Sequence, residues 1–177
     1  MTDIKHGRWA AADGEPMVLF LIGTRINRWR AVSRWRPVVA AMPRMLKELA
    51  EAPARGLLGW RTALMPPREI MVVQYWRSFE ALESYARAAE LAHLPAWRAL
   101  NRSAKDAGGA VGIWHETYVI GAHAREAVYV DMPPFGLGKA TGLVPASGAR
   151  AEARGRLAGT AAAESSTRPP PAIQPPE

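Results

Sequence analysis

The sequence contains no cysteine, and this absence excludes several kinds of chemistry. Without thiols the chain forms no disulfide, has no thiolate nucleophile and cannot bind zinc or an iron–sulfur cluster through cysteine. A cytoplasmic location fits such a chain. Long hydrophobic runs are also missing, because the longest, residues 17–22, is far shorter than the roughly 20 residues that span a bilayer. The N-terminus lacks the basic-then-apolar order of a signal peptide, so we expect a soluble, unprocessed protein.

Acidic residues are scarce early in the chain, since none occurs between Glu15 and Glu48, and the net charge is +7. The same stretch is rich in arginine, and two tryptophans lie among the arginines: Arg25, Arg28, Trp29, Arg30, Arg34, Trp35 and Arg36. Such a segment can contact a nucleic acid or an anionic membrane surface. Alternatively, residues 29, 32, 35 and 39 follow a helical spacing and face the core, while the arginines form a solvated face. We favour the core-facing interpretation and keep the anionic partners as the alternative.

Aromatic residues end at Phe135, and from residue 146 the chain consists mainly of Ala, Gly, Arg, Ser, Thr and Pro. That composition predicts a disordered tail over 146–177. Residues 1–16 lack periodicity and predict a flexible leader. Residues 132–145 are rich in Gly and Pro and predict an extended arm, because Ala140 follows Lys139 where a phosphate loop needs Ser or Thr. One folded domain remains, over 17–131.

Four apolar segments predict strands at 17–23, 57–65, 69–76 and 111–120, and a fifth, short strand is expected at 127–130. A helical region covers 27–52, where Pro37 should separate a short helix from a longer one. Ser78 caps a second helix that begins at Phe79, and Pro95 restarts a helix. The order strand, helix, strand, strand, helix, strand predicts an α+β, ferredoxin-like split βαβ fold with an antiparallel sheet.

The first and third strands are apolar on both of their sides. Helices can cover only one face of the sheet, so the other face needs a separate cover. A second copy of the chain, packed sheet against sheet, would supply it. We therefore expect a homodimer.

Several runs resemble the family named after a fumagillin-pathway monooxygenase: residues 21–29, 42–46, 73–80, 93–97, 112–118 and 132–138. The resemblance covers about residues 17–145. That family is similar to the dimeric α+β barrel proteins, among them the antibiotic-biosynthesis and haem-degrading monooxygenases. The resemblance implies a monooxygenase that oxidises a small hydrophobic or polyketide-like metabolite, without a metal ion, in a pocket between helices and sheet.

A cofactor-free oxygenase of this kind needs a base, a site for negative charge and a dry pocket. Histidine is the natural base, which makes His93 and His115 the catalytic candidates. Glu116 is the third, and as a buried carboxylate it would need a partner. Arg25 or Arg61 would be that partner or would instead hold a substrate oxyanion. His115 and Glu116 lie on opposite faces of one strand, and the sequence leaves open which face lines the pocket. A structural role is the alternative for both histidines.

Arg25 and Asn27, near the end of the first strand, are predicted to bind the substrate. Four aromatic side chains would form the wall of the pocket: Trp76, Tyr85, Trp97 and Trp114. Core packing is the alternative for these aromatics. The segment 76–93 also resembles the helix that carries the axial histidine of haem-degrading enzymes, so haem with His93 as its ligand is a second interpretation. A non-catalytic dimeric binder of a ligand or an anionic surface is a third. No histidine or carboxylate spacing predicts a metal site.

Overall fold

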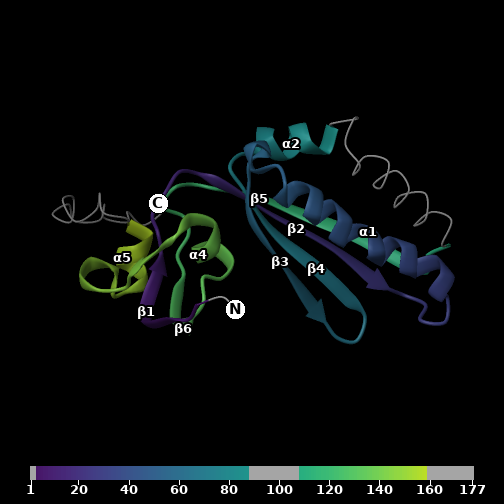
Figure 1. The fold of residues 1–177 in the computed structure, drawn as a ribbon, viewed down its shortest axis with the longest axis horizontal. Coiled ribbons are helices and arrows are strands. Elements are labelled where there is room, and N and C mark those ends of the chain that lie inside the picture. The colour runs from purple at the N-terminus through teal and green to yellow at the C-terminus, as the bar shows by residue number, and fades with distance from the viewer. Residues whose placement is uncertain (1–2, 88–107, 159–177) are drawn as a thin grey trace, which may run out of the picture.

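The computed structural model describes residues 3–87 and 108–158. Its larger part is an antiparallel four-stranded sheet of order β3-β4-β2-β5, formed by β2 (Met17–Ile26), β3 (Leu57–Met65), β4 (Glu69–Trp76) and β5 (Val111–Ile120). Two helices pack on one face of this sheet, α1 (Val32–Ala50) and α2 (Phe79–Arg87), as Figure 1 shows. A short 3-10 helix, η1 (Pro53–Arg55), leads into β3. This is the α+β, ferredoxin-like fold that the sequence predicts.

Three strands have the bounds that the sequence predicts, namely β3, β4 and β5, and β2 runs three residues further than expected, to Ile26. The strand order follows from the hairpin of β3 with β4 and from β2, which pairs with β4 on one side and β5 on the other. Both inner strands, β4 and β2, are therefore paired on both of their edges.

The main core lies between the sheet and the helices. Alternate residues of β2, such as Val18 and Ile22, face the helices because successive side chains of a strand point to opposite sides. The largest cluster of buried side chains joins strands to both helices: Val18, Leu49, Leu57, Trp76, Leu82 and Tyr85. Trp76 is fully buried, and its ring lies 5.5 Å from that of Tyr85.

Helix α1 is continuous, so the break expected at Pro37 is wrong. Both Pro37 and Pro43 lie inside the helix. A proline removes one backbone hydrogen bond, but side chains on both sides of Pro37 hold the helix in place, since partly buried Trp35 precedes it and buried Val38 follows it in the same cluster. The start of α2 is as predicted, since the backbone N–H of Ala81 donates to the Ser78 hydroxyl at 3.2 Å.

The arginine and tryptophan segment does not face the core in the way that the favoured interpretation expects. Trp29 is 43% exposed and Val32 is 48% exposed, whereas Val38 is buried. Trp29 precedes the first residue of α1, so a helical spacing does not apply to it. The core-facing prediction is therefore wrong for these two residues.

A second, three-stranded sheet of order β6-β1-β7 forms a small module beside the first sheet (Figure 1). Its strands are β1 (Lys5–Ala11), β6 (Val128–Met132) and β7 (Leu143–Pro145), accompanied by α4 (Gly136–Thr141), η2 (Gly148–Arg150) and α5 (Ala153–Ala158). The expected flexible leader thus contains a strand, the expected arm contains a helix and a strand, and the expected disordered tail is ordered as far as residue 158. The rest of that tail lies outside the described residues.

The reason for these corrections is non-local pairing. Strand β1 pairs with β6 and β7, and these partners lie more than a hundred residues away in the sequence. Each strand is too short to show a period by itself. The predicted fifth strand exists as β6, in this second sheet.

No helix among the described residues is long and apolar enough to cross a membrane.

We expect Trp76→Ala to lower the free energy of unfolding by about 3–5 kcal/mol, because it empties the centre of the main core. The substitution also removes the hydrogen bond that the indole N–H donates to Gln74 Oε1 at 2.9 Å. Urea unfolding measures the change. Leu64→Ala is the control, since Leu64 is 71% exposed, and it should shift stability by no more than about 0.5 kcal/mol. Equal losses for the two variants would contradict this description of the core.

Candidate functional site

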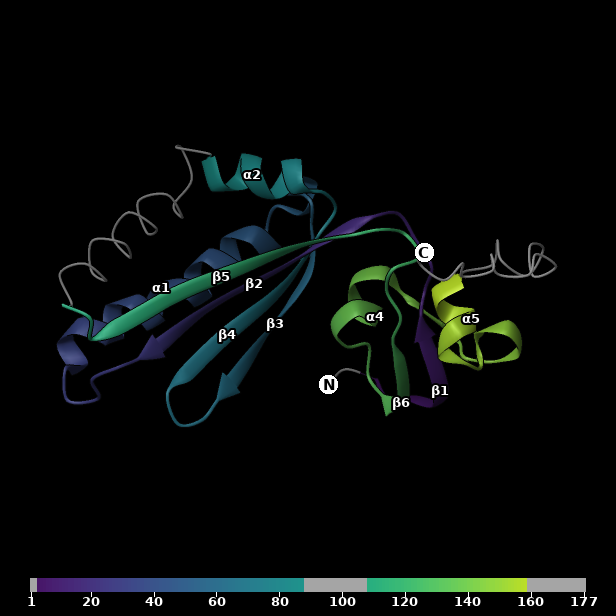
Figure 2. The same cartoon turned by 180° about the vertical axis from the view of Figure 1, so that it is seen from behind.

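A cavity of about 510 Å³ lies between the small module and the face of the large sheet that the helices leave uncovered. Figure 2 views the molecule from that face, with α1 behind the strands and the small module beside them. The cavity is lined by Met17, Leu19, Arg61, Tyr75, Ile120, Ala124, Arg125, Glu126, Ala127, Tyr129, Phe135, Gly136 and Leu137. The predicted pocket on the helical side of the sheet would involve residues 88–107, which lie outside the described residues.

The strand register brings one wall of the cavity together. Leu19 of β2 pairs with Tyr75 of β4, and Met17 pairs with Ile120 of β5. Directly paired residues point to the same face of a sheet, so all four side chains leave the face opposite the helices. Arg61 of β3 joins them because it lies two residues beyond Gly59, the partner of Tyr75. This wall is mainly apolar, with one cation and one phenol.

The Arg61 guanidinium packs over the ring of Phe135, at 4.8 Å from the ring centroid. Its Nε is buried and has no hydrogen-bond partner among the described residues. A buried donor without a partner carries an energetic cost. Arg61 forms no ion pair among the described residues, so its positive charge beside the cavity is not neutralised there.

Two tyrosine hydroxyls lie near this cation. Burial raises the pKa of Tyr75, opposed by the charge of Arg61, so the phenol keeps its proton at neutral pH. The hydroxyl of Tyr129 accepts a hydrogen bond from the backbone N–H of Gly138 at 2.9 Å, which leaves its own proton to donate. Both side chains line the cavity, so it contains two neutral donors beside a cation.

Gly136 fixes how closely the two hydroxyls approach. Its φ is +53°, a conformation that favours glycine. A Cβ at this position would lie 3.3 Å from the Tyr75 hydroxyl oxygen and 3.9 Å from that of Tyr129. The backbone of this turn therefore runs between the two hydroxyls, and any side chain would fill the space beside them.

Charged groups of the small module form the opposite wall. Burial lowers the pKa of Arg125, which donates to the backbone carbonyl of Glu15 at 2.8 Å. Glu126 pairs with Arg156 at 2.8 Å, and Arg156 also donates to the carbonyls of Arg150 and Ala151. The buried Arg156 therefore ties the C-terminal part of the described chain to the cavity wall.

The predicted catalytic residues of β5 lie outside the cavity. His115 is on the helical side of the strand, where it is exposed and its ring lies 5.7 Å from that of Phe20. Glu116 is exposed on the other side and accepts a hydrogen bond from the Tyr118 hydroxyl at 2.6 Å, which raises the pKa of that phenol. Neither predicted arginine partner pairs with Glu116. Arg25 pairs with Glu69 at 3.2 Å, and Arg61 packs over Phe135.

The predicted substrate-binding residues Arg25 and Asn27 lie at the other end of β2 from the cavity. Arg25 Nη1 donates to Asn27 Oδ1 at 2.9 Å, and Asn27 Nδ2 donates to the carbonyl of Gly109 at 3.1 Å. These bonds join the end of β2 to the loop before β5, and substrate binding by the two residues stays a prediction.

The predicted aromatic wall is divided between the two faces of the sheet. Trp76 and Tyr85 belong to the main core, whereas Trp114 lies on the uncovered face, packed so closely over Gly23 that a Cβ there would meet its ring at 2.6 Å. Trp97 and His93 lie outside the described residues, so the haem alternative, which needs His93, stays a prediction. Within the described ranges, no three residues of His, Asp or Glu are grouped as a metal ion would require.

Sequence reasoning missed Tyr75, Tyr129 and Phe135, whereas it named Arg61 as a partner for Glu116 or as a residue that holds a substrate oxyanion. One signal was available for Tyr75, because strand alternation places it on the opposite face from the core residue Trp76. No local signal indicates that Tyr129 and Phe135 meet it, since that contact depends on where the small module packs.

The fold is α+β and ferredoxin-like, and a cavity lies on the face of its sheet that the helices leave uncovered. The model of the family described as Monooxygenase af470-like matches residues 17–137, more than half of the chain. The chain belongs to this family, as the sequence resemblance indicates, and it is a monooxygenase-like protein.

Solved structures resemble the chain at low sequence identity. An aldoxime dehydratase, OxdRE, in complex with butyraldoxime is 17% identical with a TM-score of 0.60, over 73% of this chain and 38% of that one. The chain thus spans well under half of that protein, and the likeness shows the fold alone. SnoaB, a cofactor-independent oxygenase from Streptomyces nogalater, is 16% identical with a TM-score of 0.41, over 60% of this chain and 92% of that one.

A dimeric ferredoxin-like protein from an uncultured marine organism is 10% identical with a TM-score of 0.41, over 60% of this chain and 96% of that one. No curated protein matches the chain at a significant level.

Arg156→Met should lower the free energy of unfolding by about 2–3 kcal/mol, because it leaves Glu126 and two carbonyls without their charged donor. Denaturant unfolding measures this loss, and limited proteolysis should show earlier cleavage after residue 146. The matched control is Arg154→Met, at an exposed arginine of the same helix, with an expected change within about 0.5 kcal/mol. If both variants behave like the wild type, Arg156 does not fasten this segment.

Proposed function

We propose that the chain is a monooxygenase that oxidises a small, largely apolar, anionic metabolite bound in the cavity between the sheet and the small module. The observation that carries the proposal is the charge of Arg61, which forms no ion pair among the described residues and lines the cavity with Tyr75, Tyr129 and apolar side chains. A volume of about 510 Å³ also falls within the roughly 300–1,000 Å³ that is typical of small-molecule sites. Family membership supports the reaction class.

The polar groups favour a substrate with an enolate or phenolate oxygen. Arg61 attracts such an oxygen by its charge. Tyr75 keeps its proton because burial raises its pKa, and the Tyr129 hydroxyl accepts from the Gly138 N–H, which leaves its own hydrogen to donate. Three donors around one oxygen stabilise its negative charge and lower the pKa of the bound substrate.

A substrate anion of this kind can reduce dioxygen by itself. In the balanced reaction a ring CH₂ group loses two hydrogens and gains one oxygen atom, while the other oxygen atom leaves as water. All electrons come from the substrate. The chain contributes the donors that hold the anion and the apolar side chains that exclude water, among them Leu19, Phe135 and Leu137.

The test uses oxygen uptake with 1,8-dihydroxyanthrone, an apolar tricyclic compound that forms such an anion, corrected for its spontaneous oxidation. Arg61→Met should lower kcat/KM at least about tenfold, because a hydrogen bond from a charged donor is worth about 1.5–3 kcal/mol. Tyr75→Phe should lower kcat by about a hundredfold if its hydroxyl stabilises the charge that develops in the transition state. Arg77→Met, at an exposed arginine away from the cavity, is the control and should keep full activity.

His93→Leu separates this site from the pocket that the sequence places between helices and sheet. If His93→Leu loses activity while Arg61→Met and Tyr75→Phe keep full activity, the reaction takes place in that pocket and the cavity is not the active site. Loss in the cavity variants with a haem-free wild type supports the site proposed here.

We also infer that the chain forms a homodimer through the part of the sheet that the small module leaves uncovered (Figure 2). Apolar side chains of three strands lie on that face and are only partly buried within one chain, including Leu21, Met71 and Trp114. An apolar sheet face of this extent is typical of an interface between subunits.

Leu21→Glu should convert the dimer to a monomer, because it places a charge in the middle of the proposed interface. Sedimentation velocity measures the mass of the particle in solution. Leu64→Glu adds the same charge on the opposite face of the sheet and should leave the dimer intact. If the wild-type chain sediments as a monomer at all concentrations, the proposed homodimer is wrong, and the proposed reaction is unaffected.

A further inference from the structure

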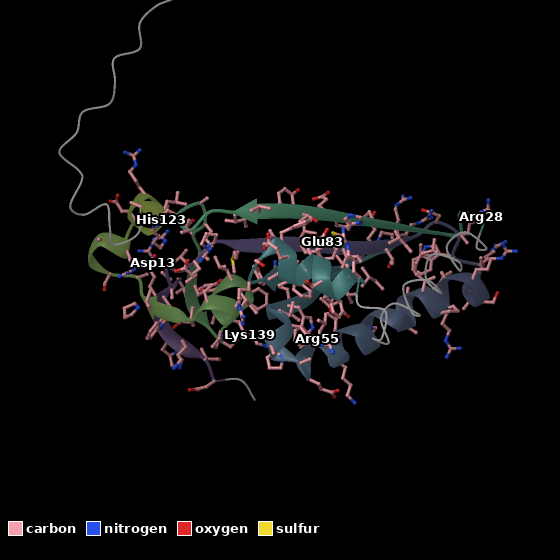
Figure 3. The ribbon with its side chains drawn as sticks, turned by 90° about the horizontal axis from the view of Figure 1, so that it is seen from above. Asp13, Arg28, Arg55, Glu83, His123 and Lys139 are labelled. Carbon is pink, nitrogen blue, oxygen red and sulfur yellow. The ribbon has the colours of Figure 1, made fainter. Side chains whose placement is uncertain are left out.

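The end of the molecule formed by the β2–α1 loop and the start of α1 carries an exposed basic and apolar surface. We call it the basic end and define it by Arg28, Trp29, Arg30, Val32 and Arg36, all of them exposed. Figure 3 shows Arg28 at one extreme of the elongated molecule, with Asp13 and His123 of the small-module region at the other. The basic end therefore lies far from the cavity.

The charge of the basic end is unopposed. None of the ion pairs among the described residues involves Arg28, Arg30 or Arg36. The neighbouring Glu69 is already paired with Arg25. The sequence has no acidic residue between Glu15 and Glu48, so the three exposed cations have no acidic neighbour within their own segment.

The apolar side chains are held in exposed positions by a fixed backbone. The N–H groups of Asn27 and Arg28 both donate to the carbonyl of Ala110, at 2.9 and 3.2 Å. The indole N–H of Trp35 donates to the carbonyl of Trp29 at 3.0 Å, and the two rings meet edge to face at 6.0 Å. The exposure of Trp29, at 43%, is therefore a property of an ordered loop.

We propose that the basic end docks onto an anionic lipid surface. Trp29 and Val32 would enter the headgroup region, where the amphipathic indole ring is favoured, and the three arginines would pair with lipid phosphates. The aliphatic Val32 favours lipid over nucleic acid, because a stacking surface for bases needs successive aromatic faces and Trp35 is turned edge-on and partly buried. Docking by this end leaves the cavity in the aqueous phase at the opposite end.

The experiment is co-sedimentation of the full chain with sucrose-loaded vesicles of phosphatidylcholine, with and without phosphatidylglycerol. The wild type should bind only the vesicles that contain the anionic lipid, and binding should weaken as salt is raised. A triple variant, Arg28→Gln, Arg30→Gln and Arg36→Gln, should bind at least about thirtyfold more weakly, because each arginine near an anionic surface contributes about fivefold.

Two matched controls separate a docking surface from general charge and hydrophobicity. The triple variant Arg8→Gln, Arg77→Gln and Arg154→Gln removes the same charge from exposed positions elsewhere and should retain wild-type binding within about threefold. Trp29→Ser with Val32→Ser should lose binding about tenfold or more, whereas Leu64→Ser, at a residue 71% exposed, should not. Thermal unfolding confirms that each variant is folded.

Three results would overturn the proposal. Equal loss in the two arginine triples would mean that net charge alone attracts the chain to the vesicles. Unchanged binding of the Trp29→Ser, Val32→Ser variant would mean that no side chain enters the lipid. Tighter binding of the wild type to a single-stranded polynucleotide than to the anionic vesicles would identify a nucleic acid as the partner. None of these results bears on the reaction in the cavity.

Discussion

The whole arrangement depends on the pairing of β2 with β4 on one side and β5 on the other. Backbone hydrogen bonds on both edges fix which residues of β2 face the helices, because a shift by one residue would exchange its two faces. With this register, Val18 and Ile22 enter the core under α1 and α2, and Leu19 and Leu21 face away from it. The side of the sheet that carries the cavity is therefore set by the same bonds that set the core.

The small module turns one end of that second face into a site. Strand β1, from the start of the chain, lies between β6 and β7, and this places Tyr129 and Phe135 opposite Arg61 and Tyr75. Arg156 fastens the C-terminal segment to the same wall through Glu126. Both ends of the described chain thus contribute to a cavity whose apolar floor belongs to the sheet between them.

The polar groups are distributed unevenly along the molecule, and this distribution separates two roles. At the cavity, a cation and two phenols are partly buried, where low polarity strengthens their interaction with a charged oxygen. At the basic end, Arg28, Arg30 and Trp29 are exposed on an ordered loop. A small molecule suits the partly buried groups of the cavity, whereas an extended partner suits the exposed ones.

Local sequence patterns determined the strands, the Ser78 cap and the order of elements, because alternation, turns and caps act over a few residues. The same patterns wrongly broke α1 at Pro37, where packing against the sheet outweighs one lost hydrogen bond. The leader and the arm were misjudged because β1 and its partners are ordered only by pairing with each other across the length of the chain. The candidate site is likewise a product of tertiary structure: the sequence supplies Arg61, Tyr75 and Tyr129, and only the packing of the small module on the sheet brings them to one cavity.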